Sequence, residues 1–201
     1  MPDKPRDLPV LSFPSAQAWE AWLAERPADA KGVWLRLAKK GSGIAGPSKQ
    51  EAIDGALCHG WIDGQIDRGD ATSWLTRFTP RKAGSRWSEN NRSRALALIA
   101  EGRMQAAGFG EIERAKADGR WDAAYASQGR ITVPDDLQAA LDADEAASRF
   151  FAGLDSANRY AVLYRIHHAR TPQARARQIE TSVAMLARGE TFHPRRGKPK
   201  A

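Results

Sequence analysis

The side chains best suited to chemistry lie between positions 61 and 91 of the chain, where tryptophan and arginine recur. The candidate binding residues are Trp61, Asp63, Arg77, Arg81, Trp87 and Asn91. Arginine forks and free backbone N–H groups at a helix N-terminus both favour anions. The segment therefore predicts a pocket for an acidic or phosphorylated ligand. Arg77 and Arg81 would supply its charge, Trp61 and Trp87 its stacking surface, and Asn91 would orient the ligand.

The same segment has two other interpretations. In a purely structural one, the tryptophans belong to the core and the arginines pair with Asp63, Asp67 and Asp70. In a catalytic one, a transferase or hydrolase uses Asp63 or His59, with Arg81 as the clamp for an oxyanion or a phosphate. We assign no catalytic residue, because no nucleophile elbow or paired-carboxylate motif is present in the sequence.

Three motifs resemble cofactor or nucleophile sites, but each lacks a required feature. Gly41–Gly46 has the spacing G-x-G-x-x-G, yet Pro47 and a capping box that starts at Ser48 place the helix after the last glycine. Pro47 also stands where a P-loop needs its lysine. Cys58 and His59 are adjacent, so they diverge on a helix and cannot form a dyad there. With one cysteine, a Cys-rich zinc site is excluded, and we expect no cofactor and no metal.

The positive charge of the chain is unevenly distributed. There are 31 Lys and Arg against 24 Asp and Glu, a formal charge of +7. Six cations against Glu89 give +5 between Arg77 and Arg94, and four cations in the tail Arg195–Lys200 give +4, which leaves −2 for the rest. Aromatic side chains interleaved with cations also suit weak nucleic-acid binding through Arg77–Arg94. This is a second alternative, because no RRM, KH or helix-turn-helix signature accompanies it.

The residue pattern predicts an α+β fold: a small, mostly antiparallel sheet packed with helices, followed by an all-helical C-terminal region. Capping residues and apolar periodicity predict helices over residues 15–25, 48–60, 88–101 and 105–118. Runs of strand-forming residues predict strands over 32–37, 61–67 and 72–79. From Pro134 onward we expect helices only.

The expected organisation has four parts, which are an extended N-terminal segment (1–14), an α+β core domain (15–126), a helical region (134–189) and a basic, disordered tail (190–201). No apolar run reaches the roughly 18–20 residues of a membrane span. The N-terminus lacks the apolar region of a secretory signal. Since a lone cysteine also suits a reducing compartment, we expect a cytoplasmic protein whose partner is an anionic small molecule or a protein.

Distinctive sequence blocks occur in a fixed order along the chain. They include Gly60-Trp61-Ile62-Asp63-Gly64, Phe78-Thr79-Pro80-Arg81, Ser85–Asn91 and Ala115–Trp121. In this order the chain resembles the YdeI/OmpD-associated family, also called bacteriocin-protection proteins, over about Phe13 to Gly189. The resemblance implies a bacterial protein involved in tolerance of bacteriocins or cationic antimicrobial peptides, a form of stress response, with no established catalytic activity. The leading hypothesis is a cytoplasmic, non-enzymatic binding protein.

Overall fold

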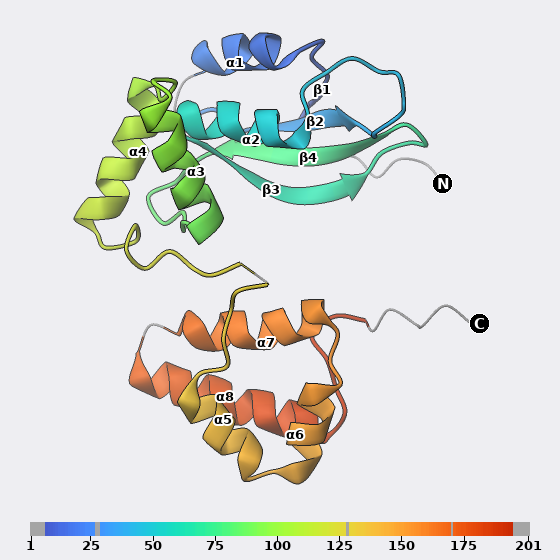
Figure 1. The fold of residues 1–201 in the computed structure, drawn as a ribbon, viewed down its shortest axis with the longest axis vertical. Helices are drawn as coiled ribbons and strands as arrows, with labels where there is room; N and C mark the ends of the chain where they lie inside the picture. The colour runs from blue at the N-terminus through green and yellow to red at the C-terminus, as the bar shows by residue number, and fades with distance from the viewer. Residues whose placement is uncertain (1–6, 27–28, 128, 170, 195–201) are drawn as a thin grey trace. The chain divides into compact units, whose positions relative to one another are not determined.

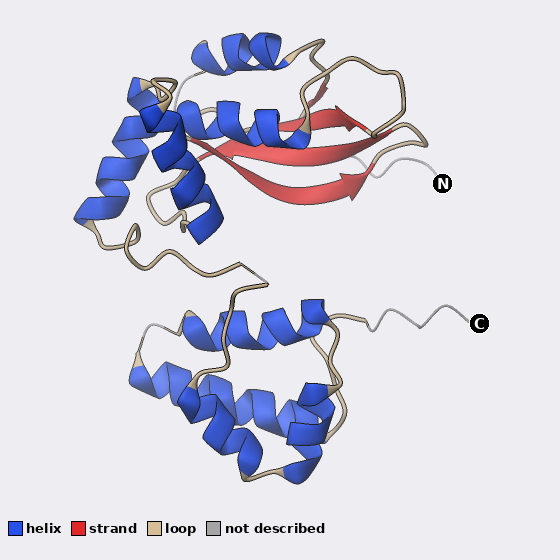
Figure 2. Cartoon of the chain, in the orientation of Figure 1, coloured by secondary structure: helices blue, strands red, loops and turns tan. Residues whose placement is uncertain are grey.

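The computed structural model describes residues 7–26, 29–127, 129–169 and 171–194 (Figure 1). The chain divides into two compact units, Met1–Ala124 and Tyr125–Ala201. The described part of the first unit contains a sheet and helices, and that of the second is helical (Figure 2). The predicted α+β fold is confirmed.

The sheet of the first unit has four strands in the order β1-β2-β4-β3. They are β1 (Val10–Leu11), β2 (Val33–Ala38), β3 (Trp61–Arg68) and β4 (Ser73–Pro80). β1 is parallel to β2, and the other two pairings are antiparallel. The two-residue strand β1 lies in the segment predicted only as extended. β3 and β4 form a hairpin in which Trp61 lies opposite Pro80 at one end and Arg68 lies opposite Trp74 at the other.

The described part of the first unit also contains four helices, and three of them begin at the serines that the sequence indicates as caps. The helices are α1 (Ala16–Ala24), α2 (Lys49–Cys58), α3 (Glu89–Ala100) and α4 (Ala106–Ala117). The Ser15, Ser48 and Ser88 hydroxyls each accept a hydrogen bond from a backbone N–H in the first turn. Ser48 and Glu51 form the predicted capping box. Figure 1 shows α1 and α2 over one face of the sheet, and α3 and α4 at the end where β3 begins and β4 ends.

The described residues of the first unit form three apolar clusters. The first lies between the sheet and α1 and α2, and it includes Trp19, Leu35, Trp61 and Phe78. The second joins the end of α2 to α3 and α4 through Trp87, Leu98 and Ile112. A small third cluster of Leu8, Trp34 and Leu75 lies on the opposite face of the sheet. Leu75 and Phe78 therefore face opposite sides of β4, as the alternation of a strand requires.

The described part of the second unit contains four helices around one apolar cluster. They are α5 (Asp135–Asp142), α6 (Glu145–Ala152), α7 (Ser156–His167) and α8 (Pro172–Ala187). Asp144, Asp155 and Thr171 cap the last three of these helices. Leu137, Leu163, Ile166 and Leu186 are fully buried in the cluster. The predicted helical C-terminal region is confirmed. None of the helices in the described residues is long and apolar enough to cross a membrane, and the tail residues 195–201 lie outside the description.

Candidate functional site

The two tryptophans of the predicted pocket belong to two different cores. Trp61 begins β3 and is 2% exposed in the first apolar cluster. Trp87 precedes α3 and is also 2% exposed, but in the second cluster. A ring that is buried on all sides offers no face to a ligand, so both rings contribute chiefly apolar area to the fold.

Arg81 and Trp87 are the two predicted site residues that the structure brings into contact. The Arg81 guanidinium carbon lies 3.6 Å from the Trp87 ring centroid, and Nη1 donates a hydrogen bond to the Arg86 carbonyl (3.2 Å). Trp87 in turn packs edge-on against Trp121, with ring centroids 4.8 Å apart. Because Arg81 is only 5% exposed, the pair is a buried cation–π contact, the kind in which loss of solvent strengthens the attraction.

A buried carboxyl lies near this pair. Glu111 of α4 is 6% exposed and forms an ion pair with Arg114, one helical turn further along. Burial raises the pKa of Glu111 above its usual value, and the nearby charges of Arg114, Arg81 and Arg120 offset only part of this rise. The environment is therefore costly for the charged carboxylate even though cations surround it.

The remaining three predicted residues lie at half-buried positions on separate elements. Arg77 of β4 donates from Nη2 to the Asp7 carboxylate (2.9 Å), which also accepts a hydrogen bond from the Trp34 indole (3.4 Å). Asp63 lies opposite Phe78 in the hairpin, and Asn91 occupies the first turn of α3. The acidic partner of Arg77 is thus Asp7, which the sequence did not indicate. The binding role of the six residues stays a prediction.

Cys58 and His59, of which only His59 belongs to the catalytic alternative, are both in buried or capping positions. Cys58 is buried, and desolvation raises the pKa of its thiol to about 11, so it is not a thiolate at neutral pH. His59 is the C-cap of α2, and burial lowers its pKa. In the described ranges, no group of three or more His, Cys, Asp and Glu side chains is placed to hold a metal ion.

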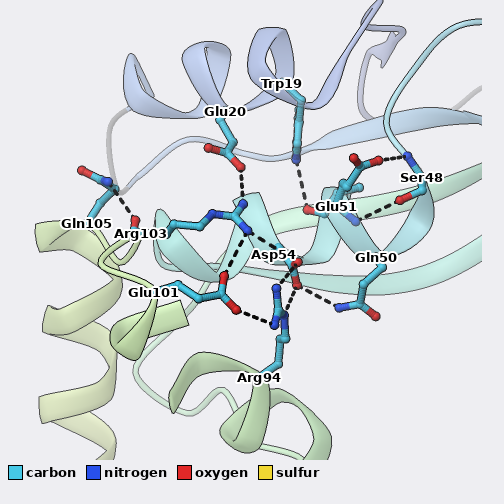
Figure 3. A network of polar contacts seen from close by, with 11 residues as sticks. Trp19, Glu20, Ser48, Gln50, Glu51, Asp54, Arg94, Glu101, Arg103 and Gln105 are labelled. Carbon is cyan, nitrogen blue, oxygen red and sulfur yellow. Dashed lines mark hydrogen bonds and ion pairs between the residues drawn. The ribbon is translucent and has the colours of Figure 1, made fainter. Parts of the chain in front are cut away.

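A network of charged side chains that the sequence did not reveal joins three helices of the first unit (Figure 3). At its centre is Asp54 of α2, which is 4% exposed. Arg94 of α3 donates from Nε to Oδ1 (2.8 Å) and from Nη2 to Oδ2 (2.7 Å), and Gln50 donates to Oδ1 (2.8 Å). Burial alone would raise the pKa of Asp54, but the hydrogen bonds from Arg94 and Gln50 hold it below its ordinary value.

The network continues through the loop between α3 and α4. Arg94 Nη1 donates to Glu101 (3.0 Å), and Arg103 donates from Nη2 to Glu20 of α1 (2.7 Å). Arg103 Nη1 also lies 3.5 Å from Glu101 and 3.9 Å from Asp54. These contacts fix α1, α2, α3 and the loop to one another. A carboxylate held by a two-point arginine contact is a weak base, so the network suits a rigid frame and not proton transfer.

Spacing along single helices is a signal that could have indicated only part of this arrangement. Gln50 and Asp54 are four residues apart and Arg94 and Glu101 are seven apart, so each pair shares a helix face. The contacts between helices depend on tertiary packing. No local pattern pairs Glu20 with Arg103 across 83 residues of sequence.

Comparison with known families divides the chain much as the structure does. Residues 11–111, half of the chain, match a family described as a domain of unknown function (DUF8412). Residues 130–189, which include α5 to α8, match the family described as Bacteriocin-protection, YdeI or OmpD-Associated. No curated protein and no solved structure matches the chain. The suspected family is thus supported by the helical region, whereas most of the motifs that carry the resemblance lie in the DUF8412 match. The chain belongs to the DUF8412 family, and its residues 130–189 match the YdeI/OmpD-associated family model.

Proposed function

We propose that the protein is a non-enzymatic, cytoplasmic binding protein that takes part in the tolerance of bacteriocins or antimicrobial peptides. The observation that carries the proposal is the family match of residues 130–189, which spans all four helices of the second unit. The buried Cys58 thiol is compatible with a reducing compartment.

The use of buried charge in the first unit supports binding over catalysis. Among the described residues, the buried carboxyl groups of Asp54 and Glu111 each form an ion pair with arginine. An anionic small molecule or a protein partner that uses the predicted site would meet the half-buried side chains of Arg77 and Asn91.

Survival of a bacteriocin-sensitive bacterium that expresses the full chain tests this function. The chain is expected to raise the dose of a cationic pore-forming bacteriocin that halves survival. Leu163→Asp places a charge in the core of the helical unit, where this leucine is fully buried. The variant is expected to abolish the gain, because an unpaired buried charge unfolds the matched region.

The same substitution at an exposed leucine provides the control. Leu96 of α3 is 52% exposed, so Leu96→Asp is expected to retain the full gain in survival. The absence of any gain with the wild-type chain would contradict the proposal. Equal protection by Leu163→Asp would contradict the role of the helical unit.

A further inference from the structure

A cavity lies at the turn end of the β3–β4 hairpin, far along the strands from Arg81 and Trp87. Its volume is about 420 Å³, within the range of small-molecule sites. The lining residues are Lys39, Ile66, Asp67, Arg68, Gly69, Asp70, Ser73 and Trp74. Lys39 directly follows β2 and the others belong to the β3–β4 hairpin, so the hairpin supplies most of the lining.

A turn built around Asp70 lines part of this cavity. Its Oδ1 atom accepts hydrogen bonds from the backbone N–H and the hydroxyl of both Thr72 and Ser73, at 2.8 to 2.9 Å. These bonds, Thr72 first, hold the pKa of Asp70 well below its usual range. Arg36 donates to Oδ2 (2.9 Å), and Lys39 donates to the carbonyls of Asp70 (2.7 Å) and Ala71 (3.2 Å). The turn therefore needs no ligand to hold its shape.

Three side chains of the wall combine an apolar surface with a cation. Arg68 lies directly opposite Trp74 in the hairpin, so the two share one face of the sheet, and Ile66 lies two residues before Arg68 on that face. Trp74 is partly buried against the first apolar cluster, which fixes its ring, while Ile66 is 60% exposed. Among the described residues, no hydrogen bond or ion pair engages the Arg68 guanidinium.

The charges around the cavity leave a positive excess. Lys39, Arg68 and Arg36 stand against the two carboxylates of Asp67 and Asp70, of which Asp70 is fully engaged by the turn. Guanidinium donors match carboxylate, phosphate and sulfonate oxygens in a two-point geometry. An apolar wall beside such donors selects a ligand with a flat apolar body and an acidic group.

We propose that the turn-end cavity binds a small aromatic anion, with its ring against Trp74 and Ile66 and its acidic group on Arg68. The inference names a site and a ligand class beyond the proposed function and does not rest on it. A full chain that fails to protect a host in the survival assay would leave this site standing. Failure of the binding experiment would leave the tolerance function standing.

Isothermal titration of the full chain with 1-naphthoate tests the site. 1-Naphthamide is the neutral analogue of the same shape, and acetate is the anion without a ring. The wild-type protein is expected to bind naphthoate about tenfold more tightly than naphthamide, because a charge-assisted hydrogen bond is lost with the amide. Acetate is expected to give no measurable binding. Arg68→Gln is expected to weaken naphthoate binding about tenfold and to leave naphthamide binding unchanged.

A matched arginine elsewhere in the same unit provides the control. The Arg26 guanidinium lies 4.6 Å from the Trp22 ring centroid, outside the cavity, so Arg26→Gln is expected to bind naphthoate as the wild type does. Trp74→Leu is expected to lose both aromatic ligands. If Trp74→Leu does not fold, Arg68→Gln still tests the site. Arg68 is exposed, so this substitution is expected to leave the fold intact. Equal wild-type affinity for naphthoate and naphthamide, unchanged naphthoate binding in Arg68→Gln, or no heat with naphthoate overturns the proposal.

Discussion

The two ends of the β3–β4 hairpin carry the same pair of residue types in opposite environments. At the end next to α3 and α4, which we call the helix end, Arg81 lies over Trp87, and both side chains are at most 5% exposed. At the turn end, Arg68 lies opposite Trp74 on the wall of a cavity. The arginine–tryptophan composition is common to both ends, so burial determines whether the pair stabilises the fold or is accessible to a ligand.

This difference follows from what covers each end. Figure 1 shows α3 and α4 beside the helix end, whereas the turn end projects away from them. Gly108 lets α4 approach the end of α2 so closely that a Cβ atom there would lie 2.4 Å from the Cys58 carbonyl oxygen. The aromatic and charged side chains between the hairpin and these helices are therefore enclosed.

Loss of the Asp54 carboxylate is expected to be the most damaging change near the helix end. Asp54→Asn leaves Arg94 with a neutral partner at a nearly buried position, and we expect the free energy of unfolding to fall by about 3 kcal/mol. Urea unfolding followed by circular dichroism measures the change. Glu113→Gln, which removes an exposed ion pair with Lys116, is the control and is expected to change stability by less than about 0.5 kcal/mol. A loss of similar size in both variants would show that the network does not stabilise the fold.

The contribution of Asp54 is expected to depend on pH with a defined sign. Because the folded pKa lies below the ordinary value of about 3.9, the ionised carboxylate adds stability above that pH. This stability is lost as the pH falls through the folded pKa. The difference in unfolding free energy between wild type and Asp54→Asn is therefore expected to be constant from pH 7 to 5 and to shrink below about pH 4. A difference that grows on acidification would reverse the assigned sign.

The close packing of α4 against the end of α2 is expected to give the next largest change in stability. Gly108→Ala places a Cβ atom 2.4 Å from the Cys58 carbonyl oxygen and 2.8 Å from that of Leu57, so we expect a loss of about 2 kcal/mol. Gly110→Ala in the same helix meets no atom within 4 Å and is expected to raise stability by up to about 1 kcal/mol. Thermal unfolding of both variants provides the measurement. Equal melting temperatures would mean that α4 does not require a glycine at this contact.

The two arginines themselves are expected to differ in their effect on stability. Arg81→Met removes a buried cation–π contact, and we expect a loss of about 1 to 2 kcal/mol. Arg68→Met at the exposed turn end is expected to change the unfolding free energy by no more than about 0.5 kcal/mol. Chemical denaturation of the two variants under one set of conditions compares them directly. A larger loss at Arg68 than at Arg81 would invert the contrast between the two ends.

The local rules of the sequence predicted most of the fold. Helix starts at Ser48 and Ser88 depend on capping within one turn, and the hairpin depends on two adjacent strand-forming runs. Strand β1 was missed because two residues carry too little periodicity, and it exists only through pairing with Trp34 and Leu35. One physical cause explains both outcomes. An element is predictable when the interactions that form it are local in sequence, and it is missed when they join residues that are distant in sequence.

The candidate site was less predictable, because burial is a property of the tertiary structure. The sequence places Arg81 and Trp87 in an aromatic, cationic segment, and this composition would serve a ligand or a core equally well. The choice depends on α4, whose Ile112 packs in the same cluster as Trp87. Asp54 was missed for the same reason, since its partner Arg94 lies 40 residues away. The turn-end pair was missed because it depends on the register of the hairpin, which places Arg68 opposite Trp74.

The contrast between the two ends is tested most directly by ¹H–¹⁵N NMR of the tryptophan indole groups during titration with 1-naphthoate. The indole signals of Trp74 and Trp87 are assigned from Trp74→Phe and Trp87→Phe spectra. A ligand at the turn end is expected to shift the Trp74 signal progressively and to leave the Trp87 signal in place, because Trp87 is enclosed beneath Arg81. A shift of the Trp87 signal with no change at Trp74 would contradict this account and would place the anion at the helix end.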